Sequence, residues 1–454
     1  MKRWRASVSR WIVFSVIVAA AVFVAGCEKD DDDDDDPQPT YPLTADYGDD
    51  VANAWVQTSR QMVKVAPVTP PVAARAYGYL GQAIYEGVVN GMPNHISLHG
   101  QINGMPPVPA TNPNLEYHWP SVVNKAAYDI LTFLFNGNAN AIPLADAQFT
   151  ALHNQYAETV DPTVLERSES YGQLVATVIE VCAEQDGYAT LHNCSYDWTA
   201  HAGPGLWEPT PPGMVTSPVE PCWGEMRPFV LDNVDADCYP VAPPAYSTDP
   251  TSAFYLEMME VYQTAGADST PEQQTIARFW ADGGGTTTPP GHWMNITNMI
   301  LNMENGDLAD AAEVYCKVGL AVNDAFISCW NAKYQMNYLR PVTAINDLIP
   351  GAESWLPPIA TPPFPECTSG HSTQSGAAYV VLTDFFGVVA FSDTTANPYG
   401  LPARSFDSFE DAAWEAAYSR LYGGIHFRTA CEVGVSQGEC IGAAVNALQF
   451  RANS

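Results

Sequence analysis

The sequence has few basic residues: 19 lysines and arginines stand against 51 aspartates and glutamates in 454 residues, a formal net charge of −32. This balance disfavours nucleic acid as a partner, because backbone phosphates need a basic surface. Such acidity is typical of a solvated surface in salty or extracellular surroundings and does not indicate a reaction. Only 15% of the residues are charged and 46% are hydrophobic, so the chain can bury one large core or two packed subdomains.

Several motifs are also absent. The sequence has no CxxC or HExxH pair, so a zinc site has weak support. It has no glycine-rich phosphate loop after a strand and no short internal repeat. After the first 26 residues no stretch reaches about 18 uninterrupted apolar residues, the length that a membrane span needs. Few runs alternate polar and apolar residues with period two, which argues against a protein built on sheets.

The N-terminus has the features of an export signal. Four basic residues precede the apolar run WIVFSVIVAAAVFV, as in a secretory signal. The ending VAGC resembles a bacterial lipobox, which implies that residues 1–26 are a lipoprotein signal peptide and that Cys27 is lipidated; an ordinary signal peptide or a short membrane anchor is the alternative. Seven aspartates at 30–36 cannot be buried, so residues 27–46 are expected to form a solvated acidic tether. We expect an exported protein, lipid-anchored to the bacterial outer membrane at the cell surface or periplasmic face.

Nine cysteines follow Cys27, and export makes disulfides feasible. The closest loop-flanked pairs are Cys222 with Cys238 and Cys182 with Cys194. The odd number leaves at least one thiol unpaired within the chain, and the sequence does not fix the connectivity.

The periodicity of the rest predicts an all-α fold built from helix bundles. Residues 47–186 contain amphipathic patterns with apolar spacings of three and four, and similar patterns resume after residue 250. Between them, residues 203–250 carry eleven prolines and cannot be regular helix. Trp207, Trp223 and Phe229 favour an ordered loop packed on the helical body over a disordered linker. We therefore expect an N-terminal helical region, 47–265, and a C-terminal helical bundle, 266–454.

Three segments of the C-terminal half carry candidate site residues. In KYQMNYLRP, Lys333 and Arg340 lie seven positions apart, so on one helix they would differ by only about 20° in direction and present two cations to one point. The alternative is a pair of solvated surface charges.

In FPECTSGHS, Ser369 is predicted to cap a helix that begins with Gly370 and His371. The free backbone N–H groups of such a helix end form an anion seat, and a histidine there can exchange protons near neutral pH. A simple cap is the alternative.

In SRLYGGIHFR, Arg420 and His426 would point about 120° apart on an unbroken helix. Gly423 and Gly424 predict a turn that brings both side chains to one site, although a helix C-cap is the alternative for these glycines.

Together, these segments resemble the three-part signature of the vanadium-dependent haloperoxidases and of their relatives, the type 2 phosphatidic acid phosphatases. The resemblance covers the chain from about Trp280 onward. It implies a tetrahedral oxyanion, vanadate or phosphate, held in a C-terminal four-helix bundle. It also implies seven site roles: equatorial oxygen contacts from Lys333, Arg340 and Arg420, a cradle from Ser369 and Gly370, axial vanadium ligation by His426, and acid–base catalysis by His371.

Four further positions bear on the choice between the two branches. The family commonly places Asp four residues after the second histidine to orient its ring, whereas this chain has Ala430. A nucleophilic histidine should need that carboxylate more than a metal ligand does, which favours the haloperoxidase. By resemblance, Trp330 and Phe364 match a halide pocket, with core packing as the alternative. Asp282 resembles a carboxylate that pairs with a site arginine.

The sequence therefore predicts a vanadate-dependent peroxidase that oxidises iodide or bromide with hydrogen peroxide to a hypohalous acid, with small organic acceptors as further partners. His371 would assist proton transfer, and Lys333 would polarise the bound peroxide. The alternatives are a secreted acid phosphatase with His426 as nucleophile and a non-catalytic surface lipoprotein. The complete set of seven site residues weakens the last alternative.

Overall fold

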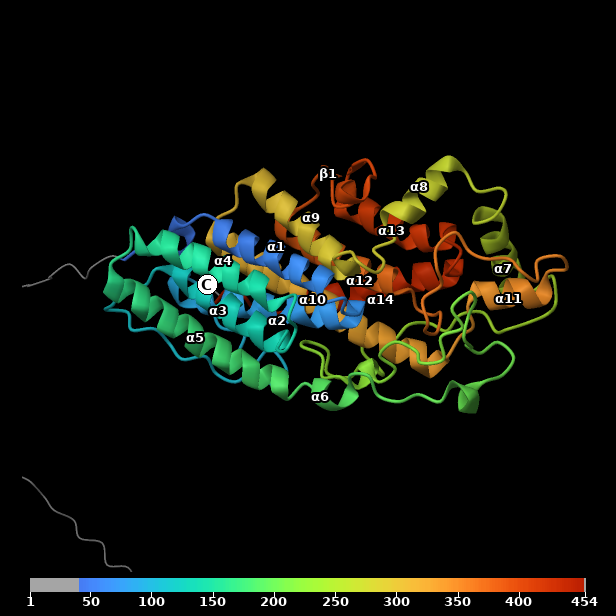
Figure 1. Ribbon diagram of the computed structural model, residues 1–454, viewed down its shortest axis with the longest axis horizontal. Helices are drawn as coiled ribbons and strands as arrows, with labels where there is room; N and C mark the ends of the chain where they lie inside the picture. The colour runs from blue at the N-terminus through green and yellow to red at the C-terminus, as the bar shows by residue number, and fades with distance from the viewer. Residues whose placement is uncertain (1–40, 453–454) are drawn as a thin grey trace, which may run out of the picture. The chain divides into compact units, whose positions relative to one another are not determined.

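In the computed structural model, which describes residues 41–452, almost all regular structure is helical (Figure 1). The predicted signal peptide, Cys27 and most of the predicted tether lie outside the described residues. The α-helices are α1 (Asp50–Val65), α2 (Pro70–Val88), α3 (Trp119–Leu134), α4 (Ile142–Ala157), α5 (Pro162–Glu184), α6 (Tyr188–Leu191), α7 (Ala253–Thr264), α8 (Pro271–Phe279), α9 (Thr288–Glu304), α10 (Leu308–Met336), α11 (Pro341–Leu348), α12 (Gly370–Phe386), α13 (Phe409–Tyr422) and α14 (Arg428–Asn446). Short 3-10 helices are η1 (Thr44–Asp46), η2 (Val89–Gly91), η3 (Trp198–His201), η4 (Trp223–Glu225) and η5 (Asn397–Tyr399). The described strands, β1 (Phe391–Asp393) and β2 (Arg404–Phe406), form one antiparallel pair. The predicted all-α class is confirmed.

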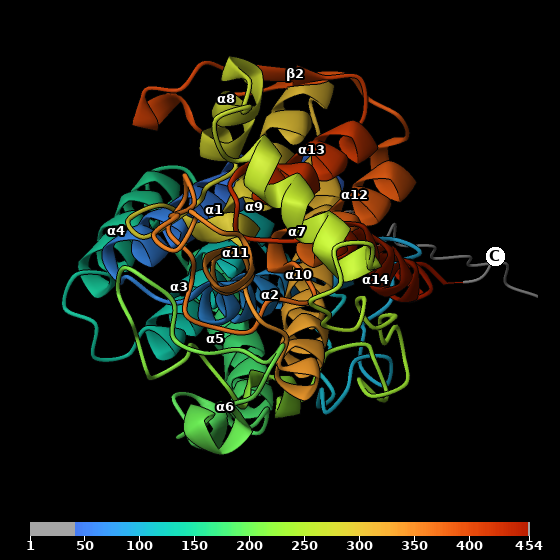
Figure 2. The ribbon, with the colours of Figure 1, turned by 90° about the vertical axis from the view of Figure 1, so that its right-hand side faces the viewer.

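Helix α10 is shared by two groups of helices. On one side it packs on α2, which contacts α3, and α3 packs on α5. On the other side α10, α12, α13 and α14 form a four-helix bundle, as Figure 2 shows. Helices from both predicted regions pack together, and the described residues show no separation into two compact bodies at residues 265 and 266. The boundary between the two regions stays a prediction.

The contact between α12 and α14 is very close. A Cβ atom added to Gly438 would lie 2.0 Å from the backbone oxygen of Thr373 and 2.9 Å from the Cα of Gly376, so a larger side chain would force the helices apart. This approach places the N-terminal ends of α12 and α14 beside each other, where the site lies.

Residues 203–250, here called the strap, form the predicted ordered loop. Trp207 and Trp223 are fully buried and Phe229 is 1% exposed. The buried Asp324 carboxylate of α10 accepts the backbone N–H groups of Phe229 and Val230, both at 2.7 Å. These contacts satisfy polar groups of a segment that has no regular ladder of its own.

The strap is also fixed by disulfides. Cys194 pairs with Cys222, and Cys238 pairs with Cys440 of α14 across 202 residues of sequence. Neither disulfide joins one of the closest loop-flanked pairs of the sequence, because the fold brings together cysteines that are remote in the chain. Cys182 is a buried free thiol of α5, and the prediction of at least one unpaired thiol is confirmed.

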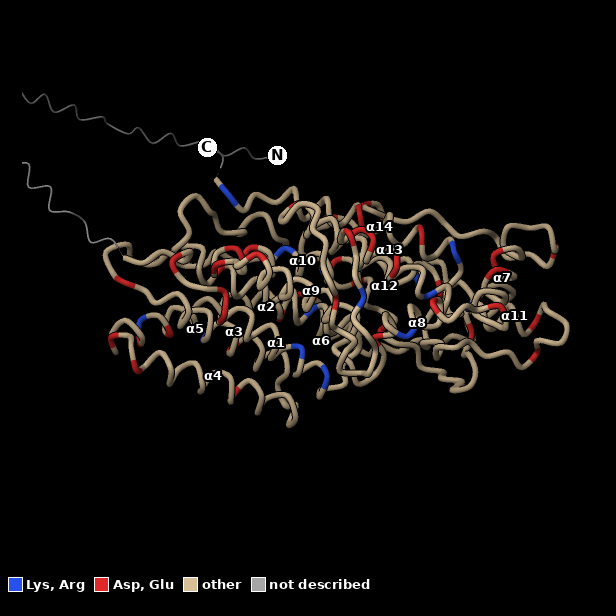
Figure 3. The backbone as a smooth tube through the Cα atoms, turned by 90° about the horizontal axis from the view of Figure 1, so that it is seen from above, with Lys and Arg blue, Asp and Glu red and all other residues tan. Residues whose placement is uncertain are grey.

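Acidic residues are spread over most elements, whereas basic residues are sparse (Figure 3). Among residues 41–452, no helix combines the length and apolar composition that crossing a bilayer requires.

Candidate functional site

The three predicted segments meet at the ends of five helices. Lys333 and Arg420 lie in the last turns of α10 and α13, and His371 lies in the first turn of α12. Arg340 immediately precedes α11, and His426 lies two residues before α14. Arg340 Nη1 is 3.2 Å from His426 Nε2, and Arg420 Nη1 is 2.8 Å from His371 Nε2. Lys333 and Arg340 are fully buried, and Arg420 and His426 are only 1% and 3% exposed.

Lys333 and Arg340 do not share a helix, so the predicted geometry of this pair is wrong. α10 ends at Met336, and Asn337 adopts the left-handed conformation with φ 45°. Arg340 is extended because it precedes Pro341, whose ring disfavours the helical conformation of the residue before it. The two cations reach one site through a chain reversal.

Arg420 and His426 are brought together as the glycine pair predicts. α13 ends at Tyr422, and Gly424 has φ +76°, a conformation that favours glycine. His426 then precedes α14 and faces the same site as Arg420.

Ser369 caps α12, as predicted. Its Oγ accepts the backbone N–H of Ser372 at 3.3 Å, which leaves the hydroxyl hydrogen available. Gly370 is the first residue of α12, where backbone N–H groups have no partner within the helix. A Cβ atom at Gly370 would lie 3.3 Å from the Trp330 ring, a tight contact that glycine avoids.

The site contains buried donors without partners. In the described part of the chain, Arg340 Nη2 and Arg420 Nε and Nη2 are buried and make no hydrogen bond. Burial, the largest cause, lowers the pKa of Lys333 to about 8 and the pKa of both arginines to about 10. Three cations in a low-dielectric space with unused donors fit a multivalent oxyanion, which would satisfy the donors and favour the charged forms.

His426 presents one ring nitrogen to this space. Its Nδ1 donates to Glu366 Oε1 at 2.8 Å, and the same oxygen accepts the backbone N–H of Phe427. Arg340 Nη1 can only donate, so His426 Nε2 must be an acceptor. Burial, followed by Arg340 and Lys333, holds the pKa of His426 well below its ordinary value. The ring is therefore neutral, with a lone pair on Nε2 that a metal centre can accept.

Glu366 is the residue that the sequence reasoning missed. It is fully buried, and burial raises its pKa to about 8 against the opposing effect of Arg340 and Lys333. It supplies the carboxyl group that is absent at Ala430, which lies fully buried in the first turn of α14. The absence of Asp at position 430 thus no longer argues against the phosphatase branch. The sequence contains one signal for this role, because Glu366 is the only acidic residue in the segment FPECTSGHS.

His371 lies on the opposite side of the site and is partly exposed to a cavity. Its Nε2 accepts from Arg420 Nη1, which also donates to the Trp280 carbonyl at 2.8 Å. Burial, then Arg420 and His292, lower the pKa of His371 well below its ordinary value. A neutral imidazole in this position can accept a proton.

Asp282 does not have the predicted arginine partner. Its Oδ2 bonds to His292 Nδ1 at 2.9 Å, while His292 Nε2 bonds to Asp393 Oδ2 at 2.6 Å. No ion pair among residues 41–452 joins Asp282 to Arg420, although its charge raises the pKa of Arg420 against burial. Asp282 has φ +42°, and this turn leaves its carboxylate beside α9. Burial alone would lower the pKa of His292, but the two carboxylates outweigh burial and raise it to about 10.

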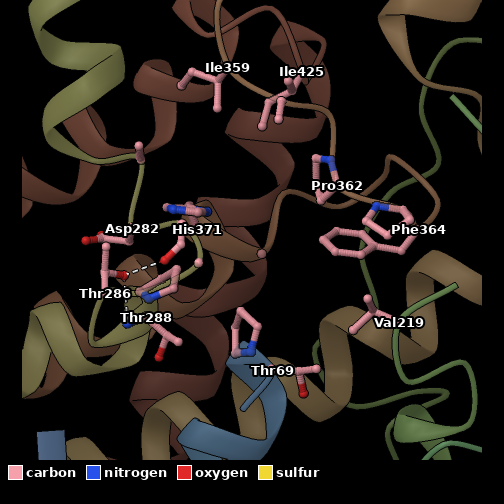
Figure 4. Close-up of a pocket in the computed structure, with 18 of the residues that line it drawn as sticks. Thr69, Val219, Asp282, Thr286, Thr288, Ile359, Pro362, Phe364, His371 and Ile425 are labelled. Carbon is pink, nitrogen blue, oxygen red and sulfur yellow. Dashed lines mark hydrogen bonds between the residues drawn. The ribbon is translucent and has the colours of Figure 1, made fainter. Parts of the chain in front are cut away.

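Above the anion site lies a cavity of about 450 Å³. Trp330 and Phe364 line it with ring centroids 5.0 Å apart, and Lys333 Nζ lies 5.7 Å and 5.1 Å from the two centroids. In Figure 4, Asp282 and His371 lie on one side of the cavity and Phe364 on the other. The structure thus places both predicted halide-pocket residues at the cavity wall, next to the cations.

Known proteins are similar to this chain in two ways, over the C-terminal helical bundle and over the whole fold. Residues 313–453 match the model of the VCPO second helical-bundle domain. Vanadium chloroperoxidase from Curvularia inaequalis is 25% identical over 219 residues, 35% of this chain and 36% of that protein. The match spans about a third of this curated relative.

Solved structures cover more of the chain. A crystal structure described as the first bacterial vanadium-dependent iodoperoxidase is 38% identical, with 90% of this chain and 99% of that chain covered and a TM-score of 0.83. A holo-type bacterial vanadium-dependent chloroperoxidase is 16% identical, with coverages of 91% and 96% and a TM-score of 0.66, which shows a shared fold alone.

Proposed function

The chain belongs to the vanadium-dependent haloperoxidases, and from this premise we propose that it oxidises iodide or bromide with hydrogen peroxide to the hypohalous acid. The observation that carries the proposal is the cluster of three buried cations, two of them arginines with unpartnered donors, beside His426, whose Nε2 accepts from Arg340. The likeness to a protein described as an iodoperoxidase supports iodide as the first halide to test.

The residues present fit vanadate, the cofactor of this family. Lys333, Arg340 and Arg420 would neutralise the oxyanion, the Ser369 hydroxyl and the Gly370 N–H would complete the cradle, and His426 Nε2 would be the metal ligand. When bound, vanadate supplies a Lewis acid centre that activates peroxide without changing its own oxidation state.

The protein residues handle protons and charge. His371, neutral because of its burial beside Arg420, accepts a proton from hydrogen peroxide and later returns it to the leaving oxygen. Lys333 draws electron density from the oxygen that the halide attacks. In the net reaction, halide, hydrogen peroxide and one proton give hypohalous acid and water, and two electrons pass from the halide to the peroxide oxygens.

A phosphatase reaction is the second candidate, favoured by the Glu366 contact. Glu366 would orient His426 for attack on phosphorus in the manner expected of a nucleophilic histidine.

One comparison tests both candidates. Purified protein should oxidise iodide with peroxide only after orthovanadate is added, and phosphate should compete with this activation. Strong hydrolysis of a phosphomonoester by vanadate-free protein, with no iodide oxidation after loading, would establish the phosphatase.

A further inference from the structure

A buried polar network lies directly behind the cradle of Ser369 and Gly370. Its centre is Gln437 of α14, which is 3% exposed. The Gln437 amide oxygen accepts the Thr368 hydroxyl at 2.6 Å, and its amide nitrogen donates to the Ser328 hydroxyl of α10 at 2.9 Å. Thr368 and Ser328 are fully buried. The network therefore joins α10, α14 and the residue that immediately precedes the cradle.

The close packing of α14 on α12 brings Gln437 to this position. Gly434 and Gly438, four residues apart, lie on the face of α14 that meets α12. A Cβ atom at Gly434 would lie 2.8 Å from the Ser372 Cβ and 3.1 Å from the Ser369 carbonyl oxygen. Gln437 is the long polar side chain between these two glycines, so its amide reaches the loop before α12 and continues to α10.

Thr368 is also held through its backbone. Its carbonyl oxygen accepts the Cys329 thiol of α10 at 3.5 Å, and the next N–H, that of Ser369, donates to the Ala430 carbonyl of α14 at 3.1 Å. With the Gln437 contact, the side chain, the carbonyl and the following amide of this residue all have partners. Because the cradle begins at the next residue, its orientation depends on how Thr368 is held.

The hydrogen bonds of the network have a fixed direction. An amide oxygen only accepts and an amide nitrogen only donates, so Thr368 must give its hydroxyl hydrogen to Gln437 Oε1. Thr373 of α12 is 3.3 Å from the same oxygen and donates to the Ser369 carbonyl at 3.1 Å. A lost partner would leave a buried amide group unsatisfied, which is unfavourable. The amide therefore keeps one orientation and holds the Thr368 side chain in place.

We propose that Gln437 is a positioning residue for the oxyanion cradle: through Thr368 it fixes the Ser369 hydroxyl and the following N–H for the bound anion. The inference deepens the proposed function and rests on it for the vanadate that the cradle holds. Gln437 is not among the residues that line the cavity, so it acts only through its neighbours. A cradle that is already ordered binds its anion more tightly, because less ordering is needed on binding.

The affinity for orthovanadate tests this role, measured by equilibrium dialysis without peroxide or halide. Thr368→Val keeps the shape of the side chain but removes the hydroxyl, and it should weaken binding about 10-fold, as expected when a ligand loses its supporting contact. Thr368→Ser restores the hydroxyl and should bind within about 3-fold of the unmodified chain. Gln437→Met keeps the length of the side chain without its amide and should weaken binding as much as Thr368→Val does.

A double variant separates positioning from a loss of stability. If Gln437 acts through Thr368, the double variant Thr368→Val/Gln437→Met should bind orthovanadate as weakly as either single variant, because both changes remove the same hydrogen bond. Thr297→Val is the matched control: Thr297 is fully buried, and its hydroxyl donates to the Trp293 carbonyl within α9 at 2.9 Å. The control should unfold at a lower urea concentration and bind orthovanadate as the unmodified chain does.

The possible results separate the two proposals. Weaker binding in Thr368→Val, recovery in Thr368→Ser and a non-additive double variant support the positioning role, and the two Thr368 variants decide it alone if Gln437→Met does not fold. Unchanged affinity in Thr368→Val, an additive double variant, or an equal loss of affinity in Thr297→Val overturns the positioning role, even where the loaded chain oxidises iodide. No iodide oxidation by the unmodified chain at full vanadate loading would instead contradict the proposed function.

Discussion

At the scale of single residues, two histidines share one anion site and differ in their neighbours. His426 is held by Glu366 through Nδ1, whereas His371 is held by Arg420 through Nε2. His426→Ala should bind vanadate weakly and lose peroxidase activity, because it removes the protein's bond to the metal. His371→Ala should retain vanadate but slow peroxide activation roughly 100-fold or more, the usual weight of general acid–base catalysis. Vanadium content after gel filtration, measured beside the iodide oxidation rate, separates the two. Loss of vanadium in His371→Ala but not in His426→Ala would reverse the assigned roles.

Glu366 should set the orientation of the ligand ring. Glu366→Ala is expected to weaken vanadate binding about 10- to 100-fold, the usual effect of removing a hydrogen-bond partner of a ligand histidine. Glu366→Gln is the matched control: its amide oxygen can still accept from Nδ1, so it should recover part of the affinity. Equilibrium dialysis with orthovanadate gives both constants. Equal affinity in Glu366→Ala and the unmodified chain would rule out this positioning role.

The seven-residue signature could be read from the sequence because each member lies in a short segment with fixed spacing. The contacts between these segments could not be read from the sequence. Glu366 and His426 are 60 positions apart, and nothing in either segment indicates that they touch. The predicted arginine partner of Asp282 was wrong because the turn at Asp282, with φ +42°, leaves its carboxylate beside His292 of α9.

At the scale of elements, the buried Asp282–His292–Asp393 group joins the loop after α8, α9 and β1. His292 is fully buried and stacks on Trp280 at 4.4 Å, and each ring nitrogen faces one carboxylate. Its pKa is about 10 in the folded protein and about 6.5 when unfolded, a difference worth about 5 kcal/mol. Because the folded pKa is the higher one, this stabilisation is fully present below about pH 6.5 and is lost as pH rises towards 10.

His292→Gln tests this dependence. The variant should lose about 3–5 kcal/mol at pH 6, since it leaves two buried carboxylates without a cation, and the difference from the unmodified protein should shrink towards pH 10. Urea unfolding of both proteins at pH 6, 8 and 10 measures it. A difference that stays constant over this range would contradict a charged His292.

Helix ends were predicted best where local chemistry decides them. Ser369 caps α12 as expected, because a hydroxyl oxygen and the next N–H groups suffice. The end of α10 at Asn337 differs from the prediction, because the seven-residue spacing of Lys333 and Arg340 is compatible with one helix, whereas Pro341 favours a break before it. The disulfide between Cys238 and Cys440 depends on packing of the strap against α14 and has no local signal.

At the scale of the whole molecule, the resemblance from residue 280 onward located the anion site but not the cavity above it. Val68 and Val219 come from the earlier part of the chain and form part of the cavity wall. The all-α class followed from periodicity, whereas the packing of α2 on α10 that brings Val68 to the site depends on tertiary contacts.

We propose that the folded enzyme is held at the bacterial outer membrane by a lipid on Cys27, on the strength of the VAGC sequence and the aspartate run that follows. The full-length chain made in a bacterial host should partition into the detergent phase, and Cys27→Ser should move to the aqueous phase, because the lipid supplies the apolar anchor. Aqueous partitioning of both proteins would remove the proposal.

The most direct test of the central claim is a titration of the full chain with orthovanadate, in which bound vanadium and the rate of iodide oxidation are measured on the same samples. If the three cations and His426 form the cofactor site, activity should rise in proportion to bound vanadium, reach its maximum at one vanadium per chain, and fall when phosphate displaces the vanadium. Iodide oxidation that is independent of bound vanadium, or one vanadium per chain without iodide oxidation, would contradict the account.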